Sequence, residues 1–233
     1  MDSIDIEGIP DIRNYVPRSV KEAFAIQRAL KERVSLENSF ESISLIAGVD
    51  LAILKERKQL VCGIILFEFP ELSVIDKVYS IVDEKFPYIP GLLSFREGPA
   101  IIEAYGKLEV KPDILILDGQ GIAHPRGFGI ACHIGVILDI PTIGVGKKKL
   151  YGTFDELGMV PGRYSPLYSK QGDTIGAVLR TKKNTKPVFV SPGHKIDLPS
   201  ALEVVTECAR GYRVPEPTRQ ADKYVAELKK EFL

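Results

Sequence analysis

The segment Asp113-Ile114-Leu115-Ile116-Leu117-Asp118-Gly119 marks the change in the chain that decides the fold. Four consecutive branched aliphatic residues between two aspartates predict a buried strand, and the glycine that follows indicates a loop. Before this segment, apolar stretches at 43–52, 61–67 and 72–82 are joined by short turns, a pattern typical of an antiparallel meander. After it, helical and strand patterns alternate.

This alternation predicts that the sheet is extended by parallel strands. Helices are expected at 94–108 and 128–138, and a short buried strand at 141–145. Shorter strands follow at 174–181 and 187–191, and the chain closes with helices at 199–210 and 218–232. The order predicts an α/β protein with a ribonuclease-H-like fold. Its mixed sheet would have three antiparallel strands, extended by parallel strands and flanked by helices.

The 233 residues suit one α/β domain, and no repeat or low-complexity linker divides them. Ser19-Val20-Lys21-Glu22 is a capping box that predicts the start of the first helix. We therefore expect residues 1–233 to form a single catalytic domain, on which residues 1–40 pack as a helical extension.

The bulk composition, 45% hydrophobic and 27% charged residues, is that of an ordinary globular protein. The longest apolar run, 63–67, is too short to cross a membrane, and the acidic start does not resemble a secretory signal. Three widely spaced cysteines in apolar surroundings predict reduced thiols in the cytoplasm, namely Cys62, Cys132 and Cys208. We expect a cytoplasmic protein with no membrane contact.

The formal net charge of 0 does not indicate nucleic-acid binding, for which a basic domain is the usual footprint. A cluster of catalytic carboxylates would, however, cancel a basic groove in the total. Local basic stretches at 147–149 and 180–186 are either part of such a groove or solvated faces.

Four acids are predicted to lie where strands and helices end: Asp50, Glu97, Asp118 and Asp222. If the strands that carry Asp50 and Asp118 are neighbours, both carboxylates project into one crevice at the carboxyl ends of the strands. Two adjacent carboxylates repel each other, and a divalent cation removes that repulsion. Mg²⁺ is the hard cation that suits carboxylate and water ligands, so the pattern predicts a magnesium site.

Each acid also has a more ordinary interpretation. Asp118-Gly119 could be a simple turn, Glu97 could complete a capping box with Ser94, and Asp222 could be a helix-surface acid. Asp50 is the least ordinary, because an acid among apolar neighbours needs a partner if it is buried.

Other site types do not match. The residues around Gly146-Lys147 lack the first glycine and the hydroxyl of a P-loop, and no nucleophile elbow G-x-S-x-G occurs. The histidines are scattered with no cysteine pair near them, which disfavours zinc; they are His124, His133 and His194.

Five strings resemble the endonuclease V family, and the resemblance runs from about Leu45 to Tyr224. The string Pro87-Tyr88-Ile89-Pro90-Gly91-Leu92-Leu93-Ser94-Phe95-Arg96-Glu97 makes the resemblance specific. The others are Ala47-Gly48-Val49-Asp50, the run from Asp118 to Arg126, Pro141 to Val145 leading into Lys147-Lys148, and the run from Gly211 to Arg219. The first forty residues carry little of the resemblance.

The resemblance implies the same ribonuclease-H-like fold, with Asp50 and Asp118 as metal ligands assisted by Glu97. It places Lys147 near the scissile phosphate. Asp222 matches a late-helix position that is His in some members and Asp in others, so its role as a second ligand or an orienting group stays open. The expected cofactor is Mg²⁺, for which Mn²⁺ would substitute.

Family members cut the second phosphodiester bond 3′ to deoxyinosine and leave the lesion in the nicked strand. Some prefer or accept inosine in RNA. Tyr88 matches a wedge that enters the duplex beside the lesion. The residues that match the base pocket are Gly91, Leu93, Gly119, His124, Gly129 and Ile130. Without the resemblance, Tyr88 could be a core tyrosine, His124 a structural hydrogen-bonding residue and Lys147 a solvated lysine.

We therefore expect a monomeric repair endonuclease that acts on DNA containing deoxyinosine, or also on inosine-containing RNA. One alternative is a ribonuclease-H-like nuclease for inosine-containing RNA or branched structures, although the 87–91 loop argues against a generic ribonuclease H, which needs no wedge. Another is a module that binds deaminated bases without cutting, although the retained carboxylates argue against it.

Overall fold

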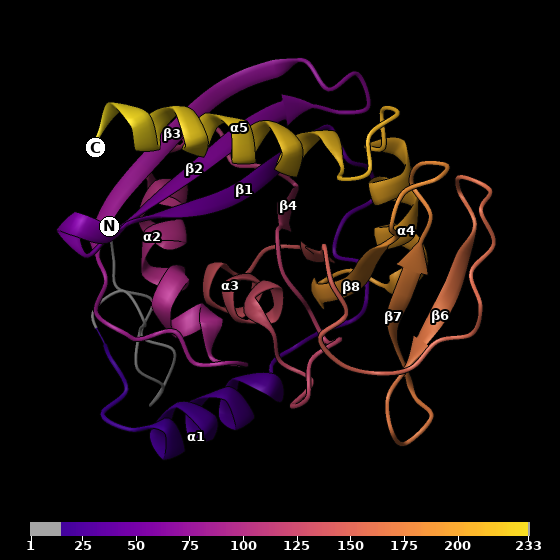
Figure 1. Cartoon of the computed structure of the whole chain (residues 1–233), viewed down its shortest axis with the longest axis horizontal. Coiled ribbons are helices and arrows are strands. Elements are labelled where there is room, and N and C mark those ends of the chain that lie inside the picture. Colours follow the sequence, from indigo (N-terminus) through magenta and orange to yellow (C-terminus); the bar gives the residue numbers. More distant parts are fainter. Residues whose placement is uncertain (1–14, 233) are drawn as a thin grey trace.

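A computed structural model describes residues 15–232, which form one eight-stranded sheet flanked by five α-helices (Figure 1). The strands are β1 (Leu45–Leu54), β2 (Gln59–Glu68), β3 (Val74–Asp83), β4 (Ile114–Leu117), β5 (Thr142–Gly146), β6 (Tyr164–Tyr168), β7 (Thr174–Leu179) and β8 (Val188–His194). The helices are α1 (Val20–Lys31), α2 (Leu93–Lys107), α3 (Ile130–Leu138), α4 (Leu198–Glu207) and α5 (Glu216–Glu231).

The sheet has the strand order β3-β2-β1-β4-β5-β8-β7-β6. β1, β2 and β3 form the expected antiparallel meander, and β1, β4 and β5 are parallel. The predicted ribonuclease-H-like fold is therefore confirmed. The parallel extension is short, because β8, β7 and β6 return antiparallel to their neighbours.

Most predicted boundaries are correct to within about three residues. The sequence did not reveal β6, which is an edge strand interrupted by Pro166; proline is tolerated at an edge because a strand there need not donate every hydrogen bond. The short turn expected between the first two strands contains a 3₁₀ helix, Lys55–Arg57. The Ser19 cap is confirmed, since its side chain accepts a hydrogen bond from the Glu22 amide. Residues 1–14 of the expected N-terminal extension lie outside the described residues.

Alternating side chains of β1 point into two separate cores. Ala47 and Val49 belong to the core that contains buried residues of α1, α2 and α3, whereas Ile46 belongs to the core beneath α4. This two-residue period lets helices cover both faces of the sheet. Figure 1 shows α5 lying across β1 and β2, which it contacts.

Gly48 brings α5 close to the sheet. A Cβ atom at this position would lie 2.2 Å from the backbone carbonyl of Pro217, so only glycine leaves room for the start of α5. Because residues two apart on a strand share a face, α5 lies on the face of β1 that also carries Asp50. The close approach thus places the C-terminal helix over the acidic residue of the central strand.

The three cysteines are free and buried, as the sequence predicted. Within residues 15–232, no helix combines the length and the apolar character that crossing a membrane requires.

Candidate active site

Strand register places Asp50 beside Asp118. In the parallel pair β1–β4, Val49 lies opposite Leu117, so each aspartate is the next residue after this matched pair. The sequence suggested that Asp50 lies where its strand ends. Instead, β1 continues to Leu54, because it still pairs with β2 after β4 has stopped. Asp222 likewise lies inside α5 rather than at its end. The crevice therefore forms where β4 stops short of its neighbour.

Lys147 joins the acids from the segment that follows β5. Its Nζ lies 2.6 Å from Oδ2 of Asp118 and 3.7 Å from Oδ1 of Asp222. The interpretation of Lys147 as a solvated lysine is thus wrong. Asp222 is on the helix surface, with 63% of its side chain exposed, yet it is also part of this cluster. The predicted group of Asp50, Asp118, Lys147 and Asp222 is brought together by four separate elements.

The electrostatics of the cluster reflect charges that are close together and partly buried. Burial, the charge of Asp118 and a hydrogen bond with Asp222 raise the pKa of Asp50 to about 8, although Lys147 acts in the opposite direction. Burial opposes the charge of Lys147, but its hydrogen bond to Asp118 and the surrounding carboxylates outweigh this, so its pKa is raised. The site therefore favours additional positive charge.

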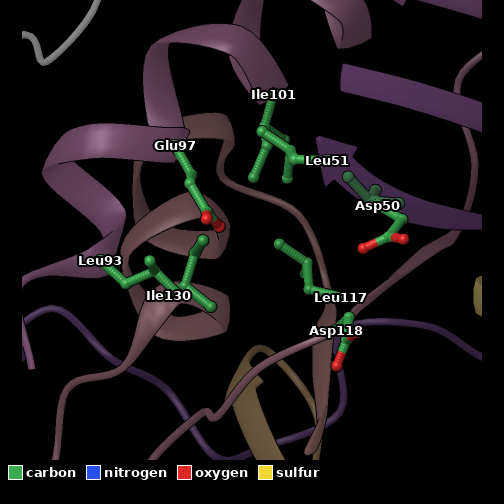
Figure 2. Close-up of a pocket in the computed structure, with 9 residues that line it drawn as sticks. Asp50, Leu51, Leu93, Glu97, Ile101, Leu117, Asp118 and Ile130 are labelled. Carbon is green, nitrogen blue, oxygen red and sulfur yellow. The ribbon is translucent and has the colours of Figure 1, made fainter. Parts of the chain in front are cut away.

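Glu97, on α2, lines a cavity of about 250 Å³ together with Asp50 and Asp118 (Figure 2). Burial, to which the charge of Asp118 adds, raises its pKa to about 7 despite the neighbouring Arg96. Glu97 does not complete a capping box. α2 begins at Leu93 without a side-chain cap, and Oγ of Ser94 instead lies 2.7 Å from Nδ1 of His133.

The three predicted metal ligands do not converge on one point. Figure 2 shows the Glu97 carboxylate beside Ile130, while Asp50 and Asp118 lie on the other side of Leu117. Within residues 15–232, no three Asp, Glu, His or Cys side chains are grouped closely enough to hold an ion. Two adjacent carboxylates are nevertheless a suitable donor set for Mg²⁺, which usually keeps several waters and binds one or two carboxylates plus substrate phosphates. The Lys147 ammonium beside Asp118 shows that a cation is accommodated there.

A second cavity, of about 460 Å³, adjoins the first and shares Leu93, Asp118 and Ile130 with it. It brings together every residue that the sequence predicted for the lesion: Tyr88, Gly91, Leu93, Gly119, His124, Gly129 and Ile130. Lys147 lines it as well. The predicted substrate residues and two of the predicted catalytic residues therefore surround one space.

Tyr88 is 62% exposed, which excludes its interpretation as a core tyrosine. The guanidinium carbon of Arg96 lies 5.8 Å from the centre of its ring. The ring stands at the rim of the second cavity on a loop between Pro87 and Pro90, where proline restricts backbone motion.

His124 is 3% exposed and has a structural role as well as a place in the cavity wall. Its Nδ1 accepts a hydrogen bond from the Arg126 amide at 3.2 Å. Burial and the charge of Arg126 lower its pKa to about 4, against the effect of a hydrogen bond to the Gly91 backbone. Its imidazole is consequently neutral near pH 7.

Sequence reasoning missed several residues of the second cavity: Gln27, Pro90, Ser94, Gln120, Gly146, Lys148 and Leu150. Several of these lie inside or next to the strings quoted above, which is a signal that could have been followed. Gln27 gives no such signal, because it is a single polar residue in a helix. Gln120 links two loops, since its Nε2 donates to the Lys148 carbonyl at 3.2 Å.

Comparison with known proteins agrees with this geometry. The family model Endonuclease V matches residues 28–223. An endonuclease V of Kosmotoga olearia is 47% identical over 215 residues, which are 92% of this chain and 94% of that protein. The crystal structure of endonuclease V from Streptomyces avermitilis, 37% identical, superposes with a TM-score of 0.88 and covers 96% of this chain and 97% of that one.

A more distant structure shows the same fold. It is the endonuclease V of Ciona intestinalis in complex with a 24mer DNA that contains an inosine followed by a ribo-adenosine. It is 24% identical, with a TM-score of 0.83 and coverage of 92% of this chain and 99% of that one. Because the family model and the Kosmotoga relative each span most of the sequence, this chain belongs to the endonuclease V family of nucleases.

Proposed function

We propose that this chain is a Mg²⁺-dependent repair endonuclease that nicks DNA at the second phosphodiester bond 3′ to deoxyinosine and leaves the lesion in place. One observation carries the proposal. Asp118 and Lys147 line the same cavity as all seven residues predicted for the lesion, so a bound base would lie next to the acidic cluster. Family membership supports a nuclease activity.

The reaction needs a metal ion and groups that manage charge around one phosphate. Mg²⁺, or Mn²⁺ in its place, would be held by Asp50 and Asp118 and would act as a Lewis acid that lowers the pKa of bound water. Lys147 would turn its ammonium from Asp118 toward the phosphate and neutralise the charge that develops there. Asp222 would limit how far Lys147 moves, since its Oδ1 lies 3.7 Å from Nζ. Glu97, with its pKa near 7, can accept or donate a proton at neutral pH.

Base recognition would depend on hydrogen bonds inside the second cavity. Hypoxanthine presents an acceptor at O6 and a donor at N1, the reverse of adenine, and it lacks the 2-amino group of guanine. Backbone groups of Leu93 and Gly119 and the N–H of Gly91 can read such a pattern once the base leaves the stack. The Gly91 carbonyl already accepts hydrogen bonds from Gln27 and Arg126. The exposed ring of Tyr88 would enter the gap that the base leaves.

The test is a nicking assay on matched duplexes that differ by one deoxyinosine in place of deoxyadenosine, with Mg²⁺, with Mn²⁺ and with chelator. We expect metal-dependent cleavage of the inosine strand only, at the second bond 3′ to the lesion. Asp118→Asn protein purified in parallel excludes a contaminating nuclease. Selective binding of the inosine duplex without cleavage under any metal condition would instead identify a non-cleaving module.

Substrates with ribose belong in the same assay, because the substrate of the Ciona protein contains a ribo-adenosine after the inosine. Single-stranded RNA with one inosine, and a branched duplex without inosine, distinguish the alternatives. Faster cleavage of the RNA would make RNA the primary substrate. Cleavage of the branched duplex would contradict lesion recognition as the main function.

A further inference from the structure

A buried glutamine of the N-terminal helix connects the two loops that line the second cavity. Gln27 of α1 is 1% exposed and itself lines this cavity. Its Nε2 donates to the Gly91 carbonyl at 3.0 Å and to the Phe128 carbonyl at 3.3 Å. Gly91 belongs to the loop between β3 and α2, whereas Phe128 belongs to the loop between β4 and α3. One amide group therefore bridges two segments that are far apart in the sequence.

Arg126 completes this connection. Its Nε donates to Oε1 of Gln27 at 2.7 Å, and its Nη2 donates to the Gly91 carbonyl. The guanidinium carbon lies 4.2 Å from the ring centre of Phe24, which is three residues before Gln27 and shares its face of α1. Both polar atoms of the Gln27 side chain are thus paired, as a buried amide requires.

The Gly91 peptide is held in an unusual conformation. Gly91 has φ of +79°, and a Cβ atom there would lie 2.6 Å from Nη2 of Arg126. Because the peptide unit is planar, donors that fix the Gly91 oxygen also fix the Leu92 amide, which donates to the Ile89 carbonyl at 2.9 Å and closes the turn before α2. Backbone groups that read a base must keep their geometry to about half an ångström. The connection from α1 therefore fixes the loop from which Gly91 and Leu93 line the second cavity, where the proposed base recognition would take place.

We propose that Gln27 is a positioning residue for lesion recognition, which acts with Arg126 to hold the two loops at the separation that admits an extruded hypoxanthine. This inference rests on the proposed function. None of the hydrogen bonds of Gln27 reaches Asp118 or Lys147. Removing it should therefore weaken selection of inosine and leave the chemical step largely intact.

The test compares Gln27→Met with Leu30→Met. Methionine is close to glutamine in size, so the first variant removes the hydrogen bonds without opening a cavity. Leu30 is fully buried on the same helix and provides the matched control for inserting methionine there. Cleavage rates of the inosine duplex are measured against enzyme concentration, at a temperature well below both melting transitions. Binding of the adenosine duplex is measured separately, by its competition with the inosine duplex.

For Gln27→Met, we expect the half-saturating concentration for the inosine duplex to rise roughly tenfold, because two buried carbonyls lose a donor. The maximal rate should stay within about twofold, binding to the adenosine duplex should not change, and Leu30→Met should match the wild type. A loss of maximal rate at unchanged half-saturation would overturn the inference, as would identical behaviour of the two variants.

Arg126→Lys provides a second variant if Gln27→Met does not fold. Lysine keeps the positive charge but lacks the planar fork that serves Gln27 and Gly91 together. The same rise in half-saturation is expected, and wild-type values would overturn the inference. If the wild type nicks only the inosine duplex, and Gln27→Met and Arg126→Lys select inosine as well as the wild type does, only the role of Gln27 is refuted. A wild type that does not nick the inosine duplex would refute the proposed function and this role with it.

Discussion

Replacing Asp50 with asparagine should stabilise the metal-free protein while it abolishes cleavage. Asp50 is held beside Asp118 by strand register, and its pKa is raised from 3.8 to about 8, chiefly by burial. The folded protein therefore binds this proton more tightly than the unfolded chain does. Between these two pH values, each unit of increasing pH removes about 1.4 kcal/mol from the free energy of unfolding.

The size of the stabilisation by Asp50→Asn follows from the pH range between the two pKa values. The contribution of protonated Asp50 is complete below pH 3.8 and is lost as the pH rises to about 8. At about pH 7 the loss would reach roughly 4 kcal/mol for an isolated group. Because Asp50 is only partly buried, solvent screens part of this cost, and we expect asparagine to stabilise the metal-free protein by about 2 kcal/mol at pH 7. Asparagine does not titrate, and the advantage should shrink to about zero near pH 4.

The assay is urea unfolding in chelator at a series of pH values from about 5 to about 8.5. Asp155→Asn is the control, since it removes the same charge from an exposed position and should change stability by less than about 0.5 kcal/mol. The reasoning would be refuted if Asp50→Asn were no more stable than the wild type at pH 8. A stabilisation that did not decrease toward pH 5 would also refute it.

Three further predictions concern the metal, the wedge and the close approach of α5. Asp118→Asn should lower the cleavage rate by a factor of at least ~10²–10³. It should also remove the stabilisation by Mg²⁺, which for the wild type should be about 2.7 kcal/mol at an Mg²⁺ concentration a hundred times the Kd of the metal. An equal shift of the melting temperature in both proteins would place the metal elsewhere. Tyr88→Ala should weaken binding and cleavage of inosine duplexes roughly ten- to a hundredfold with little change in Tm, because an exposed ring contributes stacking to the substrate and little to the core. Tyr88→Phe should retain activity, and undiminished cleavage by Tyr88→Ala would exclude the wedge. Gly48→Ala should destabilise the fold by about 1–3 kcal/mol, because its Cβ would meet the Pro217 carbonyl 2.2 Å away; an unchanged urea midpoint would show that α5 is not packed as described.

Local patterns were enough to predict most elements, because they depend on residues that are neighbours in the sequence. The aliphatic run at 114–117 specifies a buried strand, and the Ser19–Glu22 box specifies a helix start. β6 escaped prediction, since an edge strand can contain a proline and needs little apolar alternation. The family resemblance also identified Tyr88, His124 and five other residues that line the second cavity, before any contact was known.

The sequence by itself determined the order of the elements, the family, and which side chains carry charge or an aromatic ring. Only the tertiary structure decided how these side chains meet. Asp50 and Asp118 become neighbours through the register of two strands whose paired residues, such as Val49 and Leu117, are far apart in the sequence, and no local pattern encodes that register. Glu97 was expected to join them, but α2 places it across the cavity. In the sequence, Gln27 is one polar residue of a predicted helix. Its proposed role arises only because folding buries it against Gly91 and Phe128, where its amide donates to both carbonyls.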